Sequence, residues 1–420
     1  MKKENFFKKH PAPLTYLAAF ARWCVLGVIT GIFGGILGAA FTKAITYATN
    51  FRLEHSWIIY FLPIGGLVIV FLYRSLKLGN AGTNEIFETV RNEKKIPVRL
   101  LPAVFSGSII SHLFGGSVGR EGAALQIGGS LAALFSKILK LDDKKQHILI
   151  MCGMSAAFSA VFCAPLTAAI FSVEVICVGY LYSSALLPCL ISSLTAYAVS
   201  LKLGIKPDNF KVGIIPKSNL KTLLFVVLLA IIASVVSVVF CKSMHISSHL
   251  FEKYLKNEYL RIASGGLLIV ILTVVLKTND YNGSGIDIIE NIFHNGEVKY
   301  EAFLLKIIFT AITVGVGYKG GEIVPTMFIG ATLGASVAKI AGMPISFGAA
   351  LGISSLFCSV TNCPLATVLL SIEFFGADGI IFYTLSAFIS FLVSGYASLY
   401  TGQKIVFSKT SDEEINIAGK

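Results

Sequence analysis

Long apolar runs recur from one end of the chain to the other, and this feature restricts the fold more than any other. The runs 223–240 and 265–276 are two examples. A soluble domain with a single anchor would be much more polar than this chain, in which 55% of the residues are hydrophobic and 14% are charged. Because a chain in lipid must satisfy its backbone polar groups internally, runs of this length predict a bundle of membrane-spanning helices.

Several of the apolar segments are too short, or too often interrupted by glycine and proline, to cross a membrane as simple helices. The chain contains 39 glycines. Glycine lets helices approach one another closely and lets them break within the membrane. The sequence therefore predicts an all-α polytopic membrane protein in which some helices are broken.

An internal repeat divides the chain into two homologous halves. The block A-P-L-T-A-A-I-F-S-V-E ends at Glu174, and the related block C-P-L-A-T-V-L-L-S-I-E ends at Glu373. Two further blocks recur in the same order, so we expect a first repeat over residues 1–205 and a second over 206–420, joined by the polar connector 202–221. Repeats in membrane transporters are often inverted, with the substrate site at their interface near the midplane, and by analogy we expect the same here.

The charge distribution predicts the orientation of the chain. The formal net charge is +12, and four lysines precede the first apolar run, at positions 2, 3, 8 and 9. Lysines in short loops set membrane orientation, so we expect a cytoplasmic N-terminus and a retained first segment. The short charged tail 408–420 is expected to be disordered, with no cytoplasmic regulatory domain after the second repeat.

The motif with the clearest chemistry is Gly119-Arg120-Glu121-Gly122, which directly precedes the apolar segment 123–139. A carboxylate at the start of an intramembrane helix faces the positive end of the helix dipole and backbone N–H groups that can hold an anion. Glu121 can therefore occupy an anion site as a tethered mimic of the ion, and it would leave that site when protonated. The alternative is an Arg-Glu pair in a loop at the membrane surface.

The second half carries a related segment, G-G-E-I-V-P, which ends at Pro325. Proline suits the first turn of a helix, where its missing N–H has no cost. The backbone N–H groups of Ile323 and Val324 are then expected to point at the same midplane position from the other half. Glu322 is a second carboxylate at this depth, and it has two open roles: proton transfer, or pairing with a charge such as Lys319 at the helix start.

A third segment, G-N-A-G-T-N-E, covers Gly79 to Glu85 and precedes a helix-like run. Asn80, Thr83 or Asn84 can cap that helix. Their polar hydrogens can also contact an anion, and the sequence leaves both roles open.

The order of these three segments resembles the CLC family of chloride channels and transporters, and the resemblance covers nearly the whole chain. It implies a homodimer of two-fold inverted repeats in the lipid bilayer, with one anion pathway per subunit and broken helices whose N-termini point at the ion. It also implies that Glu121 is the gating glutamate. A small anion and a proton are the expected partners, and no cofactor, metal or nucleic acid is expected.

The chain departs from the family pattern at several places, among them Ala123 in place of the proline after G-R-E-G and Ile323 in place of a phenylalanine. The serine of the first motif is replaced by Ala81, or by Asn80 if the alignment shifts by one residue. Glu322 stands where the second motif has an apolar residue, and Val175 stands where exchangers carry an internal proton-transfer glutamate. The central tyrosine near the C-terminus aligns with Phe407, within T-G-Q-K-I-V-F.

These departures are similar to those of one branch, the bacterial CLC-F fluoride/proton antiporters. Fluoride is small and strongly hydrated, so it needs close, strong donors such as an amide. The resemblance thus implies fluoride export across a bacterial-type plasma membrane, with Glu121 as gate and Glu322 in proton transfer. The predicted anion-binding residues are Asn80, Ala81, Gly82, Gly119, Arg120, Gly122, Ile323, Val324 and Phe407.

The main alternative is a chloride-selective CLC channel or chloride/proton exchanger. An enzyme with Glu121 and Glu322 as acid and base is disfavoured, because no nucleophile or metal ligand set accompanies them. His245 and His249 have helical i,i+4 spacing, but no glutamate lies between them. A cation transporter is disfavoured because helix N-termini attract anions.

Overall fold

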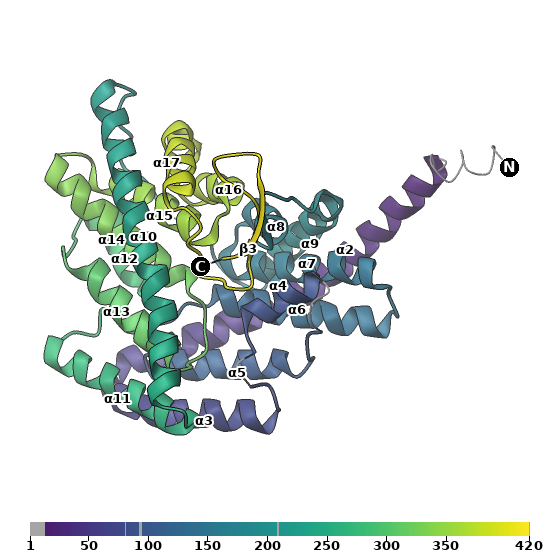
Figure 1. Cartoon of the computed structure of the whole chain (residues 1–420), viewed down its shortest axis with the longest axis horizontal. Coiled ribbons are helices and arrows are strands. Elements are labelled where there is room, and N and C mark those ends of the chain that lie inside the picture. The colour runs from purple at the N-terminus through teal and green to yellow at the C-terminus, as the bar shows by residue number, and fades with distance from the viewer. Residues whose placement is uncertain (1–12, 80, 92–94, 208–209, 420) are drawn as a thin grey trace.

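The computed structural model describes residues 13–79, 81–91, 95–207 and 210–419, and these residues are mostly helical (Figure 1). Before the connector lie α2 (Pro13–Glu54), η1 (Ser56–Phe61), α3 (Leu62–Ser75), α4 (Thr83–Val90), α5 (Leu100–Leu113), α6 (Glu121–Ile138), α7 (Asp143–Phe162), α8 (Pro165–Glu174), β1 (Cys177–Val178) and α9 (Ser183–Lys202). After it lie α10 (Leu220–Tyr254), α11 (Glu258–Leu276), α12 (Ile286–Asn295), α13 (Ala302–Gly315), α14 (Ile323–Ala341), α15 (Ile345–Thr361), α16 (Pro364–Phe375), η2 (Ala377–Gly379), α17 (Ile380–Val393), β2 (Lys404–Phe407) and β3 (Glu414–Ala418).

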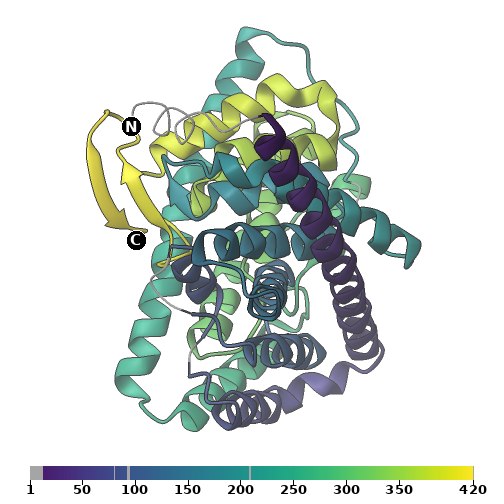
Figure 2. The same cartoon turned by 90° about the vertical axis from the view of Figure 1, so that its right-hand side faces the viewer.

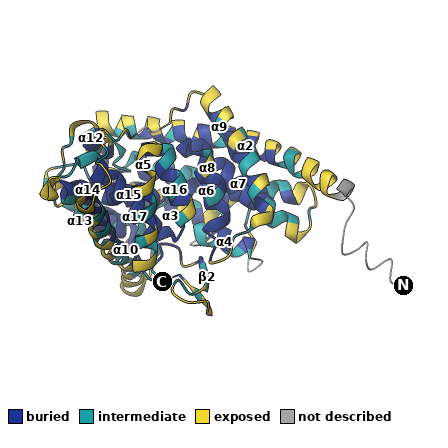
Figure 3. Cartoon of the chain, turned by 90° about the horizontal axis from the view of Figure 1, so that it is seen from above, coloured by how far each residue is buried: buried dark blue, intermediate teal, exposed yellow. Residues whose placement is uncertain are grey.

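Within the described residues, seven helical segments are long and apolar enough to cross a membrane. The outer helices turn large apolar side chains outward, such as Leu220, which is 72% exposed, and Val275, which is 69% exposed. Figure 3 shows the buried residues gathered on α6, α7, α14 and α15 and the exposed residues on the surrounding helices. Lipid is the solvent that such a surface requires, which confirms the predicted polytopic membrane fold.

Several helices are too short to span, as the sequence predicts for broken helices. Helix α4 has 8 residues and α8 has 10, whereas a simple spanning helix needs about 20. Short helices of this kind end inside the molecule. Their unpaired backbone groups therefore lie where they can bind an ion or a side chain.

Glycines set the close packing of the central helices. A side chain at Gly128 of α6 would overlap the carbonyl oxygen of Gly153 on α7, and one at Gly334 of α14 would overlap that of Gly348 on α15. The two helix pairs occupy related places in the two repeats. Close approach of small residues is a general way to bring helices together in lipid.

Reciprocal contacts between α8 and α16 relate the two halves. The carboxylate of Glu174, the last residue of α8, accepts a hydrogen bond from the backbone N–H of Ala366 at 2.8 Å. The carboxylate of Glu373, in the last turn of α16, accepts one from the backbone N–H of Thr167 at 2.9 Å. Each helix is thus capped at its start by a residue from the end of the other, which gives the pair an approximate two-fold relation. The inverted orientation of the halves in the membrane stays a prediction.

The predicted disorder of the tail 408–420 is wrong for its described residues. Strand β3 pairs antiparallel with β2, and β2 pairs parallel with β1. Figure 2 shows the two C-terminal strands together at the edge of the molecule. The ammonium of Lys409 donates to the carbonyl of Phe391 at 2.7 Å, at the end of α17. The tail is charged, but one of its charges is anchored in a helix end and Ile417 pairs with Ile405, so it is ordered.

Candidate functional site

An isolated antiparallel bridge joins the two glycine-rich segments. The N–H of Gly119 donates to the carbonyl of Gly321 at 2.6 Å, and the N–H of Gly321 donates back at 2.7 Å. A side chain on Gly321 would overlap the backbone nitrogen of Gly122, so this approach requires glycine. The bridge places the starts of α6 and α14 side by side, which is the meeting of helix N-termini expected from the repeat.

Glu121 is the first residue of α6 and is 0% exposed. One carboxylate oxygen accepts the backbone N–H of Arg120 at 2.9 Å, and the other accepts from Nε of the same residue at 3.3 Å. The side chain therefore turns back onto the start of its own helix, where the dipole and the unpaired N–H groups favour a negative charge. That Glu121 stands in for an anion at this helix end stays a prediction.

Glu322 directly precedes α14 and lies on the other side of the bridge. A Cβ atom built on Gly122 would lie 3.3 Å from Oε2 of Glu322, so this carboxylate is next to the start of α6 as well. Oε2 is buried and has no hydrogen-bond partner among the described residues. A buried oxygen without a donor is costly, and it is suited to accept a proton.

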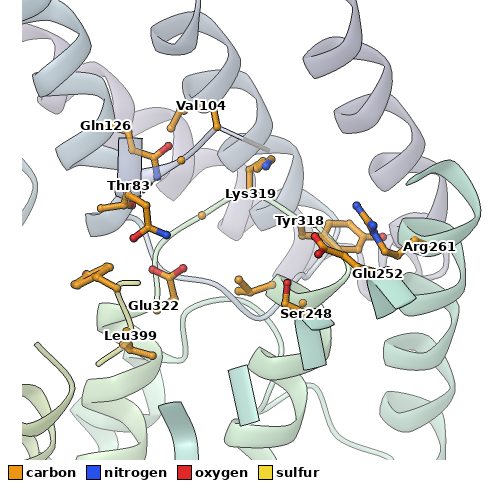
Figure 4. A pocket seen from close by; sticks show the side chains of 18 residues that line it. Thr83, Val104, Gln126, Ser248, Glu252, Arg261, Tyr318, Lys319, Glu322 and Leu399 are labelled. Atoms are coloured by element: carbon orange, nitrogen blue, oxygen red, sulfur yellow. Dashed lines mark hydrogen bonds between the residues drawn. The ribbon is translucent and has the colours of Figure 1, made fainter. Parts of the chain in front are cut away.

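A cavity of about 240 Å³ opens beside Glu322. Its walls come from the start of α4, from α5, α6, α10, α11 and α13, from the loop before α14 and from residues 399–400 near the C-terminus. Figure 4 shows Glu322, Thr83 and Gln126 near one another at one end of this cavity.

The start of α4 contributes Ala81, Gly82 and Thr83 to the cavity wall. The N–H of Gly82 is taken by its own helix, since it donates to the side chain of Glu85 at 2.6 Å. The hydroxyl of Thr83 accepts a hydrogen bond from Gln126 at 2.9 Å and keeps its own hydrogen for another partner. Asn80, a predicted ligand, lies outside the described residues.

The start of α14 has the form that the sequence predicts. Pro325 is in the first turn, which confirms that interpretation of the G-G-E-I-V-P segment. Ile323 is 0% exposed and Val324 is 2% exposed, so their first-turn N–H groups are enclosed by protein. A Cβ atom on Gly119 would lie 3.1 Å from that of Val324, which places this helix start against the Gly119 motif.

The placement of Phe407 at the site needs correction. Phe407 lies on β2, packs on Gly179 and is 40% exposed, and it is not among the residues that line the cavity. Two aromatic rings line it, those of Tyr318 and Tyr400. The hydroxyl of Tyr318 donates to the carbonyl of Leu62 at 2.7 Å, whereas Tyr400 is 2% exposed and its hydroxyl has no hydrogen-bond partner within the described residues. The side chain of Asn84 binds Thr401 and the N–H of Gly402 at 2.9 and 2.8 Å, and beyond this anchor the chain leaves the site as a strand.

Comparison with known proteins gives one family. The family model for voltage gated chloride channels matches residues 65–395. A "chloride/fluoride channel protein" of Pseudomonas syringae pv. tomato is 32% identical over 409 residues, which cover 96% of this chain and 90% of that protein. An "H(+)/Cl(-) exchange transporter ClcA" of Vibrio campbellii is 25% identical and covers 88% of this chain and 84% of its own length.

A solved structure resembles the whole fold. It is the crystal structure of a CLC-type fluoride/proton antiporter, which superposes with a TM-score of 0.89 at 31% identity. The superposition covers 92% of this chain and 98% of that one.

Proposed function

Because this chain belongs to the CLC family, whose members are voltage-gated chloride channels and related transporters, we propose that it is a fluoride/proton antiporter that exports fluoride from the cytoplasm. One observation carries the proposal. The bridge between Gly119 and Gly321 places two carboxylates, Glu121 and Glu322, at adjacent helix starts inside a membrane protein. Ionisable groups at this depth are costly and are kept for transport.

The proposed exchange depends on competition for one helix end. Charged Glu121 occupies the start of α6, and its carboxylate accepts the N–H of Arg120. When Glu121 takes up a proton it loses its attraction to the dipole, leaves, and makes room for an anion. The return of the charged side chain requires release of the proton and displaces the ion. One proton and one anion thus move in opposite directions.

Glu322 supplies the proton from the cavity side. Its buried Oε2 has no donor among the residues described, and the carboxylate lies against Gly122, the residue after Glu121. A proton bound to Glu322 therefore needs to travel only a short way to reach the gate. This role replaces that of the internal glutamate, because the position expected for it is Val175.

The proposed preference for fluoride rests on the hydrogen-bond donors near the site, since the serine of the family pattern is absent. The first motif has no serine hydroxyl, whereas Thr83 lines the cavity together with Glu322, the residue before α14. A small and strongly hydrated ion gains most from close N–H and O–H donors. Two of the similar proteins carry fluoride in their names, which supports the same preference.

Flux from liposomes tests this function. We expect purified protein to release trapped fluoride, followed with a fluoride electrode, and to take up protons at the same time, followed with a pH probe. Chloride release at a higher rate than fluoride release would favour a chloride exchanger of the family instead. Fluoride release without proton movement would favour a channel.

A further inference from the structure

The cavity beside Glu322 is also lined by two cations, Arg261 and Lys319. Figure 4 shows Arg261, Glu252 and Ser248 at one end, Glu322 and Thr83 at the other, and Lys319 between them. Ser248 and Glu252 come from α10, Arg261 from the following helix α11, and Lys319 from the loop before α14. The proposed exchange at Glu121 uses Glu322 but neither Arg261 nor Lys319.

Arg261 is an unusual residue for a cavity wall. It lies in the first turn of α11 and is only 7% exposed, and its Nε is buried without a hydrogen-bond partner among the described residues. Its backbone is fixed, because its N–H donates to the carbonyl of Asn257 at 2.9 Å. Arginine keeps its charge under all ordinary conditions. A buried guanidinium with an unpaired N–H lowers stability unless a further acceptor, such as an anion, accepts a hydrogen bond from it.

Lys319 is the second of these cations. Its ammonium lies 4.3 Å from the centroid of the Tyr73 ring, which holds the side chain in place without neutralising it. Lys319 and Arg261 both line the cavity and also a smaller neighbouring cavity of about 80 Å³. The two cations thus face a shared space.

Two carboxylates, those of Glu258 and Glu252, lie near these cations. Glu258 accepts a hydrogen bond from Nε of Arg74 at 2.8 Å, at the outer edge of the smaller cavity. Glu252 lines the larger cavity and is exposed, so solvent screens its charge more than it screens the buried Arg261. Arg261 and Lys319 thus share the cavity walls with the carboxylates of Glu252 and Glu322. A cation in an enclosed space attracts an anion more strongly than one in bulk water does.

We propose that Arg261 and Lys319 form a second anion site, here called the vestibular site, which receives a small inorganic anion before it reaches Glu322. A cavity of about 240 Å³ has room for an ion together with several of its water molecules. Flexible cationic side chains bind a hydrated ion without selecting its size, so chloride and bromide fit this site as well as fluoride. The inference rests on anion transport as proposed above, but not on the preference for fluoride.

Bromide is the probe for the vestibular site, because its anomalous scattering locates it in crystals of the whole protein. We expect a bromide peak beside the guanidinium of Arg261 or the ammonium of Lys319. The peak should be lost in Arg261→Gln and in Lys319→Gln, and retained in Arg261→Lys and in the control Lys253→Gln, an exposed cation on α10 that does not line the cavity. A wild-type crystal without this peak, or a peak that persists in both glutamine variants and is an adventitious ion only, would overturn the proposal.

Transport kinetics test whether the vestibular site lies on the ion path. Arg261→Gln should raise the KM for fluoride about three- to tenfold at low ionic strength, with the maximal rate and the proton-to-fluoride ratio unchanged, because only the capture of the ion is weakened. High salt should reduce the difference, and Arg261→Lys should restore the KM. An unchanged KM in Arg261→Gln would contradict the proposal. If chloride were transported faster than fluoride, the proposed preference for fluoride would be rejected. The vestibular site would still be tested by the bromide peak.

Discussion

Two carboxylates carry the proposed exchange, and the first prediction concerns Glu121. Glutamine has the shape of glutamate but cannot take up or release a proton, so Glu121→Gln should uncouple the two ions. We expect fluoride flux to continue while proton flux falls to about a tenth or less of the wild-type value, the loss expected when an essential proton carrier is removed.

The measurement for Glu121→Gln is simultaneous recording of fluoride and pH in liposomes. Glu54→Gln, an exposed glutamate at the end of α2, is the matched control. Fully coupled transport by Glu121→Gln would remove this residue from the mechanism.

The corrected position of the aromatic ring gives a second prediction. Tyr400→Phe removes a hydroxyl that faces the cavity, whereas Phe407→Leu changes a side chain on the exposed strand β2. Loss of one hydrogen-bond donor should weaken fluoride binding by about 0.5–1.5 kcal/mol, which is about two- to tenfold in affinity.

Calorimetric titration of both variants with sodium fluoride distinguishes the two rings. Phe407→Leu should bind as the wild type does. Weaker fluoride binding by Phe407→Leu, together with unchanged binding by Tyr400→Phe, would show that Phe407 and not Tyr400 contributes to the anion site.

At the scale of elements, the reciprocal caps of α8 and α16 hold the two halves together. Glu373 accepts the N–H groups of Leu166 and Thr167 at 2.9 Å each, and also the hydroxyl of Thr167. Glu373→Ala should leave these donors unpaired and lower the free energy of unfolding by about 1–3 kcal/mol. Glu373→Gln keeps one acceptor oxygen, so it should lower the free energy of unfolding by less than Glu373→Ala does.

Thermal unfolding in detergent measures this effect. Glu174→Ala should lower the Tm to a similar extent, because it leaves the equivalent donors at the start of α16 unpaired. An unchanged Tm in both alanine variants would show that the reciprocal caps add nothing to stability.

The sequence predicts the elements best where one physical constraint dominates. The glycines and Pro325 fix the broken helices and the start of α14, because few other residues allow that backbone. The tail was misjudged because its charges indicate solvent exposure, whereas the structure anchors Lys409 against the carbonyl of Phe391. That contact depends on tertiary structure and leaves no local signal in the sequence.

At the scale of the whole molecule, the repeat explains how residues far apart in sequence form one site. Equivalent segments of related halves meet when the halves pack about a two-fold axis, so the proximity of Glu121 and Glu322 follows from the repeat. The cavity does not, because its walls come from eight helices or loops that share no pattern. Arg261 and Tyr400 line the cavity only because the tertiary structure brings their elements together. Neither residue could be predicted from the sequence.

The central claim is that protons drive fluoride through the site held by Glu121, and uphill transport tests it most directly. Liposomes are prepared with equal fluoride inside and outside and with a more acidic medium on one side of the membrane, and fluoride is followed with an electrode. The account predicts that fluoride accumulates on the acidic side against its own gradient, and that Glu121→Gln abolishes this accumulation. Fluoride that stays equally distributed in wild-type liposomes, while it still exchanges across the membrane, would contradict the account.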